Sequence, residues 1–276
     1  MDNRPIGIFD SGIGGLTSVR EFSKILPNED IIYFGDTARI PYGTRSKETI
    51  MKYALQDISF LLEHDVKMIV AACGTVSAIL PQKITQEFDF LFTGVLLPAV
   101  QTACVKTRNG KIGVIGTPAT IRSGSYGKAI RNIQPNATII GNACPLFVPL
   151  IENGYTNRDN EVTRLVARQY LEPFIEAGVD TLILGCTHYP IIEDIIGDIM
   201  GEDCVLISPG ACAAKFAENI LTQNDMLKTD GIKGRRTYYA SDSIELFSEN
   251  AKSLLGESLD QKAIKIDIDL IDDSIL

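Results

Sequence analysis

The sequence has few histidines, no closely spaced cysteine pairs, no basic block and no long apolar run. Only His64 and His188 are present, so a multi-histidine metal site cannot be built. The six cysteines include no Cys-x-x-Cys motif and show no disulfide-framework spacing. The longest apolar stretch, 88–100, contains Asp89 and Pro98 and is too short to cross a bilayer.

Positive charge is also scarce, because 26 Lys and Arg stand against 35 Asp and Glu, a formal charge of −9. A phosphate backbone would be repelled overall, so we expect no nucleic-acid partner. The N-terminus lacks a basic stretch followed by an apolar one, so we expect no secretory signal. These features together predict a cytoplasmic protein with reduced thiols and no membrane partner.

What is present is an alternation of short β-branched runs and longer amphipathic stretches in a chain of 276 residues, which is about two domains. Predicted strands are 6–9, 31–34, 68–72, 92–95, 112–115, 138–140, 181–184 and 205–207, and predicted helices include 16–26, 46–64 and 160–177. Several strand runs lack polar alternation, as strands covered on both faces should. The fold class is therefore α/β, with mostly parallel sheets flanked by helices.

The sequence also repeats itself weakly. IGIFDSGIGGLTSV from Ile6 is similar to IGVIGTPATIRSGS from Ile112, and VKMIVAACGTVSAI from Val66 is similar to VDTLILGCTHYPII from Val179. The second pair aligns Cys73 with Cys186. Two similar α/β domains are the economical interpretation, although any α/β chain repeats strand, turn and helix.

Outside the repeats, the polar segment 223–236 is predicted to be a surface loop. The tail 264–270 alternates apolar and polar residues like a half-buried edge strand. We expect one domain to comprise 1–96 with 208–276, and the other 97–207.

Ligands of parallel α/β sheets bind at the carboxyl ends of the strands, and four segments place reactive groups there. The first is the turn 10–15, DSGIGG, whose glycines permit close backbone approach before a helix N-terminus. It is no dinucleotide fingerprint, since Thr17 replaces the third glycine, and it could be an ordinary turn capped by Asp10 and Ser11. The second is the loop 35–43, GDTARIPYG, between a predicted strand and a predicted helix. It could be part of a functional site or only a solvated connection.

The other two segments carry cysteines, in 73–75 (CGT) and 185–189 (GCTHY). A free cysteine is usually a small buried hydrophobe, which suits the other four. Cys73 and Cys186 each end an apolar run before a Thr-bearing turn, where a helix N-terminus is expected to lower the thiol pKa toward neutrality. His188 could tune Cys186, whereas His64 is expected at the exposed end of a helix.

Two thiols on facing domains can move a proton across one carbon centre. One thiolate removes a proton from one face while the other thiol delivers a proton to the opposite face. A cysteine with a histidine could instead carry out acyl transfer, and two close sulfurs could serve redox exchange.

The segments 7–16, 33–43, 72–75, 115–117 and 182–190 resemble the glutamate racemase family, and the similarity covers nearly the whole chain. The resemblance implies two α/β domains related by a pseudo-two-fold, with the active site in the cleft between them. It implies interconversion of L- and D-glutamate without pyridoxal phosphate or metal, supplying D-glutamate for peptidoglycan. Family members are often dimers, so a homodimer is expected.

Site residues follow from the same resemblance. Cys73 and Cys186 would be the acid and base, with Asp10 assisting Cys73, and His188 and Glu152 assisting Cys186. Further positions implied for substrate binding are Asp10, Ser11, Pro41, Tyr42, Gly43, Gly74, Thr75, Thr117, Thr187 and His188.

Two departures from the family pattern matter. Gly74 stands where the family usually has asparagine, so backbone donors or water would have to replace a side-chain amide. Segment 207–212 also differs, without affecting a catalytic group. A related racemase or decarboxylase with another substrate, or a catalytically silent binding protein, are the alternatives.

Overall fold

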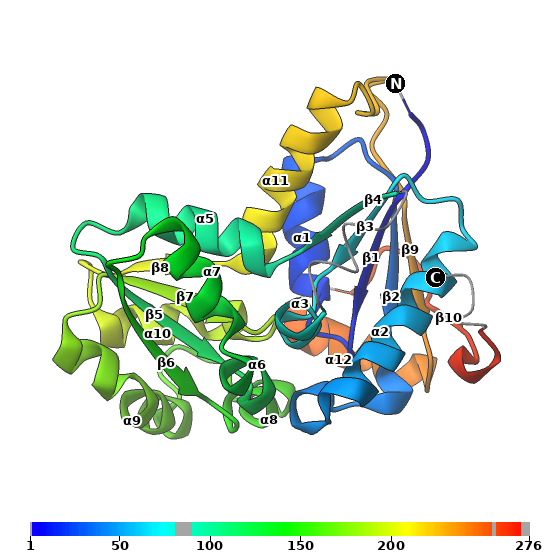
Figure 1. The fold of residues 1–276 in the computed structure, drawn as a ribbon. Coiled ribbons are helices and arrows are strands. Elements are labelled where there is room, and N and C mark those ends of the chain that lie inside the picture. Colours follow the sequence, from blue (N-terminus) through cyan, green and yellow to red (C-terminus); the bar gives the residue numbers. More distant parts are fainter. Residues whose placement is uncertain (1, 81–89, 256–257, 272–276) are drawn as a thin grey trace.

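The computed structural model describes residues 2–80, 90–255 and 258–271, and its strands form two parallel sheets (Figure 1). The six-stranded sheet has the order β10-β9-β2-β1-β3-β4 and the four-stranded sheet the order β6-β5-β7-β8. Their bounds are β1 Ile6–Asp10, β2 Ile31–Gly35, β3 Met68–Ala71, β4 Leu91–Gly94, β5 Lys111–Gly116, β6 Thr138–Ala143, β7 Thr181–Gly185, β8 Val205–Ile207, β9 Arg236–Ala240 and β10 Ile264–Lys265. The predicted α/β class with two parallel sheets is confirmed.

The two sheets share a strand order that matches the sequence repeat. β1 pairs with β2 and β3, and β5 pairs in the same way with β6 and β7. Ile6 lies opposite Met68 in one sheet and Ile112 opposite Thr181 in the other, and these are the residues that the two sequence repeats align. The shared register supports the interpretation of two similar halves.

Helices cover both sheets. Their bounds are α1 Leu16–Ile25, α2 Lys47–Leu62, α3 Gly74–Ile79, α5 Leu96–Lys106, α6 Pro118–Ser123, α7 Ser125–Ile133, α8 Phe147–Glu152, α9 Glu161–Ala177, α10 Glu193–Met200, α11 Pro209–Gln223 and α12 Ile244–Leu255. Short 3-10 helices are η1 Thr37–Arg39, η2 Tyr42–Thr44, η3 Tyr189–Ile192 and η4 Ile268–Leu270. The longer predicted helices begin at side-chain caps, since Ser46 accepts from the Thr49 N–H and Asn160 from the Thr163 N–H.

Burial explains why the central strands were visible in the sequence. Every residue of β1, β3 and β7 is buried, so these strands carry apolar residues and glycine except at Asp10 and Thr181, which lie at strand ends. β9 was not predicted, because its half-exposed sequence RTYYA has no apolar run. The predicted strand over 264–270 is wrong beyond Lys265, since Asp267 caps the Asp269 N–H and begins η4.

The halves lie side by side with the carboxyl ends of both sheets near their junction (Figure 1). At the junction α11 contacts α5, α3 contacts α6 and α8 contacts α12. All strands of the larger sheet fall in 6–94 and 236–265, and all strands of the smaller in 111–207. We therefore propose the division into 1–96 with 208–276, and 97–207.

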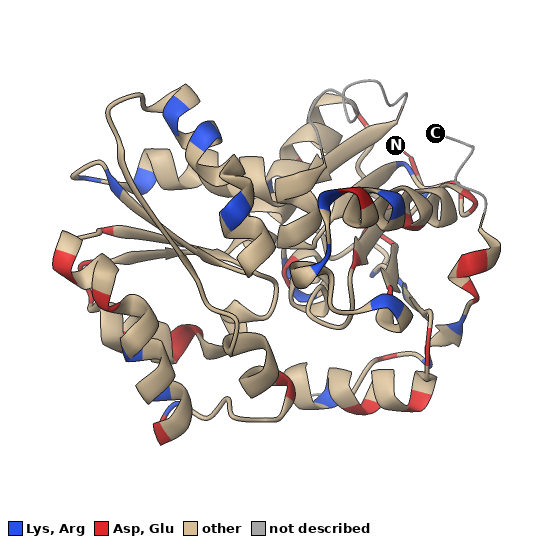
Figure 2. Cartoon of the chain, turned by 60° about the horizontal axis from the view of Figure 1, so that its bottom comes forward, with Lys and Arg blue, Asp and Glu red and all other residues tan. Residues whose placement is uncertain are grey.

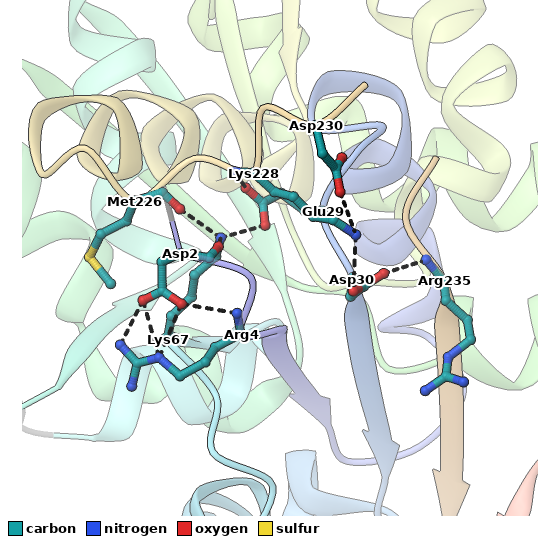
Figure 3. Close-up of polar contacts among 9 residues, drawn as sticks. All are labelled: Asp2, Arg4, Glu29, Asp30, Lys67, Met226, Lys228, Asp230 and Arg235. Atoms are coloured by element: carbon teal, nitrogen blue, oxygen red, sulfur yellow. Dashed lines mark hydrogen bonds and ion pairs between the residues drawn. The ribbon is translucent and has the colours of Figure 1, made fainter. Parts of the chain in front are cut away.

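A buried ion pair lies at the N-terminal ends of the strands of the large sheet (Figure 3). The Lys67 ammonium lies 2.6 Å from a Glu29 carboxylate oxygen, with the two side chains 0% and 2% exposed. Lys67 also donates to the carbonyls of Asp2 and Met226. Glu29 in turn accepts from the backbone N–H of Lys228, so the predicted surface loop after α11 is anchored at its first residues.

Charged residues lie mostly on helices and connections, and the strands carry few of them (Figure 2). Both signs are interspersed on the helices at the bottom of that view. Within the described residues, no helix has the length and apolar character needed to cross a membrane.

Candidate active site

Cys73 lies directly after β3, where it is the N-cap residue of α3 and is 4% exposed. Its thiol is 3.6 Å from the Ser11 hydroxyl. The predicted lowering of its pKa is wrong: burial, with the negative charge of Asp10, raises the pKa of Cys73 to about 12. The six-residue helix and the Ser11 contact act in the opposite direction but are too weak to compensate for lost solvation. Cys73 is therefore a thiol at neutral pH.

Cys186 follows β7 and lies in a chain of polar contacts. Its sulfur is 3.9 Å from His188 Nδ1, and His188 Nε2 is 3.0 Å from a Glu152 carboxylate oxygen. Burial alone would lower the pKa of His188, but hydrogen bonds to Cys186 and Glu152 outweigh it and raise this pKa to about 10. The ring is thus an imidazolium that can donate to both neighbours, which places a positive charge beside the Cys186 sulfur.

Asp10 ends β1 and is buried where the two halves meet. Its carboxylate accepts from the Gly12 N–H at 3.1 Å and from the Thr187 hydroxyl at 3.4 Å. Burial raises the pKa of Asp10, while the charge of His188 and the N–H groups of the turn oppose that rise. Asp10 therefore links the glycine-rich turn of one half to the Cys186 turn of the other.

The glycine at position 14 of this turn allows the two halves to pack closely. A Cβ on Gly14 would lie 2.5 Å from the His188 ring and from the Thr187 hydroxyl. The Thr17 hydroxyl bonds to the Thr187 carbonyl at 2.8 Å across the same boundary. In the sequence, Thr17 is notable only because it breaks a dinucleotide motif. No local pattern predicts its contact with the other half.

Threonines meet on the other side of the junction. Thr75, on α3, and Thr117, the N-cap of α6, have hydroxyls 3.0 Å apart. Thr120 bonds to both at 3.4 Å and 3.0 Å. The resemblance implies Thr75 and Thr117 but not Thr120, which no motif in the sequence marks.

Gly74 is the point at which the two cysteine segments touch. A Cβ there would lie 2.3 Å from the Gly185 carbonyl oxygen and 3.6 Å from the Cys186 Cα. The Gly185 carbonyl occupies the space that a side chain at residue 74 would need, so backbone donors or water stay the predicted replacements for a side-chain amide. A cavity of about 10 Å³ beside Cys186 has room for about one water molecule.

The segment that carries Pro41, Tyr42 and Gly43 borders the threonine cluster. A Cβ on Gly43 would be 2.9 Å from the Thr117 Cβ. The Tyr42 hydroxyl contacts Asp36 and Asp57 within its own half, and Pro41 is exposed. Substrate binding through Tyr42 would thus have to use its backbone.

The other four cysteines and His64 have different surroundings. All six cysteines are free, with Cys104 and Cys144 buried and Cys204 and Cys212 half-buried. His64 packs against Phe60 and Tyr239 after α2 rather than standing fully exposed. Among the described residues, no group of three or more His, Cys, Asp or Glu is arranged to hold a metal.

Comparison with known proteins gives a consistent result. Residues 17–217 match the family model described as Asp/Glu/hydantoin racemase. The chain is 46% identical over 259 residues to a glutamate racemase from Geobacter metallireducens, covering 94% of this chain and 95% of that protein.

Two crystal structures are similar over nearly the full length. A glutamate racemase isoform from Bacillus anthracis has a TM-score of 0.91 at 33% identity, covering 97% of this chain and 98% of its own. The glutamate racemase from Francisella tularensis in complex with D-glutamate has a TM-score of 0.88 at 42% identity, covering 98% and 99%. The chain therefore belongs to the Asp/Glu/hydantoin racemase family.

Proposed function

We propose that this enzyme interconverts L-glutamate and D-glutamate by proton transfer between Cys73 and Cys186. One observation carries the proposal: two cysteines, each at the end of a central strand of its own sheet, sit on segments that touch through Gly74 and Gly185. Each sulfur has its own polar partner, Ser11 or His188. Relatives and structures named glutamate racemase support glutamate as the substrate.

The charges around the two sulfurs suit a reaction that needs one thiolate and one thiol. The His188 imidazolium stabilises a negative charge on Cys186, while Cys73 retains its proton. A Cys186 thiolate takes the α-proton of L-glutamate, and the Cys73 thiol donates its proton to the opposite face of the carbanion. The product is D-glutamate with the proton now on Cys186, and the reverse reaction begins from that state.

The α-proton of an amino acid is very weakly acidic, so the carbanion must be stabilised by donors around the α-carboxylate. Candidates are the hydroxyls of Ser11, Thr75 and Thr187 and the N–H groups of the turn that follows Asp10. These groups come from both halves, so only the assembled junction brings them together. We propose that the halves part to bind substrate and close around it, which would exclude water from the reacting groups.

The proposed binding set is Asp10, Ser11, Pro41, Tyr42, Gly43, Gly74, Thr75, Thr117, Thr187 and His188, with Glu152 orienting His188. Glu152 is the best supported orienting group, because its carboxylate bonds to His188 Nε2. D-Glutamate made in the cytoplasm would supply peptidoglycan synthesis. We also propose a homodimer from the family resemblance, which analytical ultracentrifugation tests.

The test is incubation of the reduced enzyme with L-glutamate in D₂O. We expect D-glutamate with deuterium at the α-carbon, since the proton donated to the product comes from a thiol that exchanges with solvent. Aspartate and other amino acids in parallel incubations define the substrate. Folded, reduced enzyme that yields no D-glutamate would point to another substrate or to a silent binding protein.

A further inference from the structure

Two buried carboxylates outside the cysteine site share one cation and one hydroxyl. Asp36, after β2, and Asp57, on α2, are both 0% exposed. Arg39 donates from Nε to Asp36 at 2.6 Å and from Nη2 to Asp57 at 3.0 Å. The Tyr42 hydroxyl contacts an oxygen of each carboxyl group, at 3.1 Å in the case of Asp57.

If both carboxyl groups are ionised, the Tyr42 hydroxyl cannot make a full two-centre hydrogen bond to each of them. A tyrosine hydroxyl has a single hydrogen, and an ionised carboxylate has none to donate. If Tyr42 donates to Asp36, its contact with Asp57 is a hydrogen bond only when Asp57 carries the proton. Two ionised carboxylates against Arg39 alone would also leave a net negative charge buried.

The proton belongs on Asp57 rather than Asp36. Asp36 already accepts from Arg39 Nε, from the Tyr42 hydroxyl and from the Ser241 hydroxyl at 2.8 Å, which suits an ionised carboxylate. Asp57 Oδ1 accepts from Arg39, so Oδ2 is left to donate to the Tyr42 oxygen. Burial and then the charge of Asp36 raise the pKa of Asp57 well above its ordinary value. Arg39 and Tyr42 oppose this rise, and Asp10 adds to it.

We infer that Asp57 is a neutral carboxylic acid in the working enzyme, and that the cluster of Asp36, Arg39, Tyr42 and Asp57 is a positioning device for segment 36–44. Arg39 further binds Gln56 at 2.5 Å and lies 4.2 Å over the Tyr53 ring, so the segment is tied to α2. The segment reaches the other half at Gly43, which packs on Thr117. The inference deepens the proposed function, because it assigns the groups that hold one wall of the site.

The proton on Asp57 determines how the stability of the fold changes with pH. A carboxyl group whose folded-state pKa is raised binds a proton that the unfolded chain has released at neutral pH. Stability is therefore lost as pH rises from the unfolded pKa of Asp toward the folded pKa of Asp57. Tyr33, whose own pKa is raised well above its ordinary value by burial and nearby acids including Asp57, does not titrate in this window.

The decisive experiment compares Asp57→Asn with Asp36→Asn in the full chain. An asparagine mimics a protonated Asp57, so Asp57→Asn should keep kcat and KM for glutamate within about twofold. Its denaturation midpoint at pH 7 should equal or exceed that of the parent, by a margin that grows with pH above 5. Asp36→Asn removes the charge that balances Arg39, so its midpoint should fall and kcat/KM should drop at least about tenfold.

Carboxyl-detected ¹³C NMR of the parent chain separates this inference from the proposed function. We expect one aspartate carboxyl signal that remains protonated at pH 7 and disappears in Asp57→Asn. No such signal, or a clear loss of stability in Asp57→Asn at pH 7, would overturn the inference even if glutamate is racemised. The signal together with a stable Asp57→Asn variant would uphold the protonated state even if glutamate is not the substrate.

Discussion

At the two sulfurs, the surroundings create an asymmetry that the sequence repeat does not contain. Cys73 and Cys186 align in the repeat, yet Cys73 faces the Ser11 hydroxyl and the Asp10 charge, while Cys186 faces the His188 imidazolium. Cys73 is thus held as a thiol by its burial, whereas the sulfur of Cys186 has the His188 ring as its polar partner. A two-thiol proton transfer requires one thiolate and one thiol at the start of each turnover, with the two roles exchanged for the reverse reaction.

Replacing either sulfur tests this assignment. Cys73→Ser or Cys186→Ser should lower racemisation by about 10²–10⁴-fold, because a serine hydroxyl is far too weak an acid and base to replace a thiol. Circular-dichroism assays of both enantiomers measure the loss. Cys204→Ser is the matched control, since Cys204 is half-buried and outside the site, and it should remain active. Near-normal turnover in either site variant would remove that thiol from the mechanism.

At the scale of elements, the ends of β1, β2 and β3 are held by the buried pair Lys67–Glu29 shown in Figure 3. The pair joins four parts of the chain: the N-terminal segment, the connection between α1 and β2, the start of β3 and the connection after α11. It lies at the opposite ends of the strands from the cysteine site. Its contribution is therefore to stability and not to chemistry.

Removing one partner of this pair should be costly. Lys67→Met leaves the Glu29 charge buried without its cation, which should destabilise the fold by about 3–5 kcal/mol in urea unfolding. Lys24→Met is the control, because Lys24 pairs with Glu21 at an exposed surface, and its loss should cost less than about 1 kcal/mol. Equal effects of the two substitutions would show that the buried pair has no special role.

At the scale of the whole molecule, the separation of the two halves depends on a missing side chain at residue 74. Gly74→Ala puts a methyl group 2.3 Å from the Gly185 carbonyl, so the halves must move apart. We expect kcat/KM for glutamate to fall at least about tenfold, because a shift of about 1 Å in reacting groups is enough for such a loss. Gly127→Ala, with its nearest neighbour at 3.6 Å, is the control. Full activity in Gly74→Ala would mean that catalysis does not need this contact.

Much of the fold could be predicted because the information is local. The buried central strands, the capped helices α2 and α9, and the repeat that aligns Ile6 with Ile112 all appear as patterns within short windows. β9 escaped prediction because it pairs with β2 from the far end of the chain and is only partly buried. Its place in the sheet is fixed by that distant partner rather than by its own pattern.

Apolar periodicity and motif residues lie along the chain, so the α/β class, the two parallel halves and the family can be deduced without coordinates. The ionisation of the site and the role of Gly74 cannot, because both depend on contacts between distant segments. Burial and distant charges raise the Cys73 pKa against the expectation from its helix position. Likewise, the Gly185 carbonyl, over a hundred residues away, fills the space beside Gly74. Ionisation and close approach depend on neighbours in space, and those exist only after the halves have folded against each other.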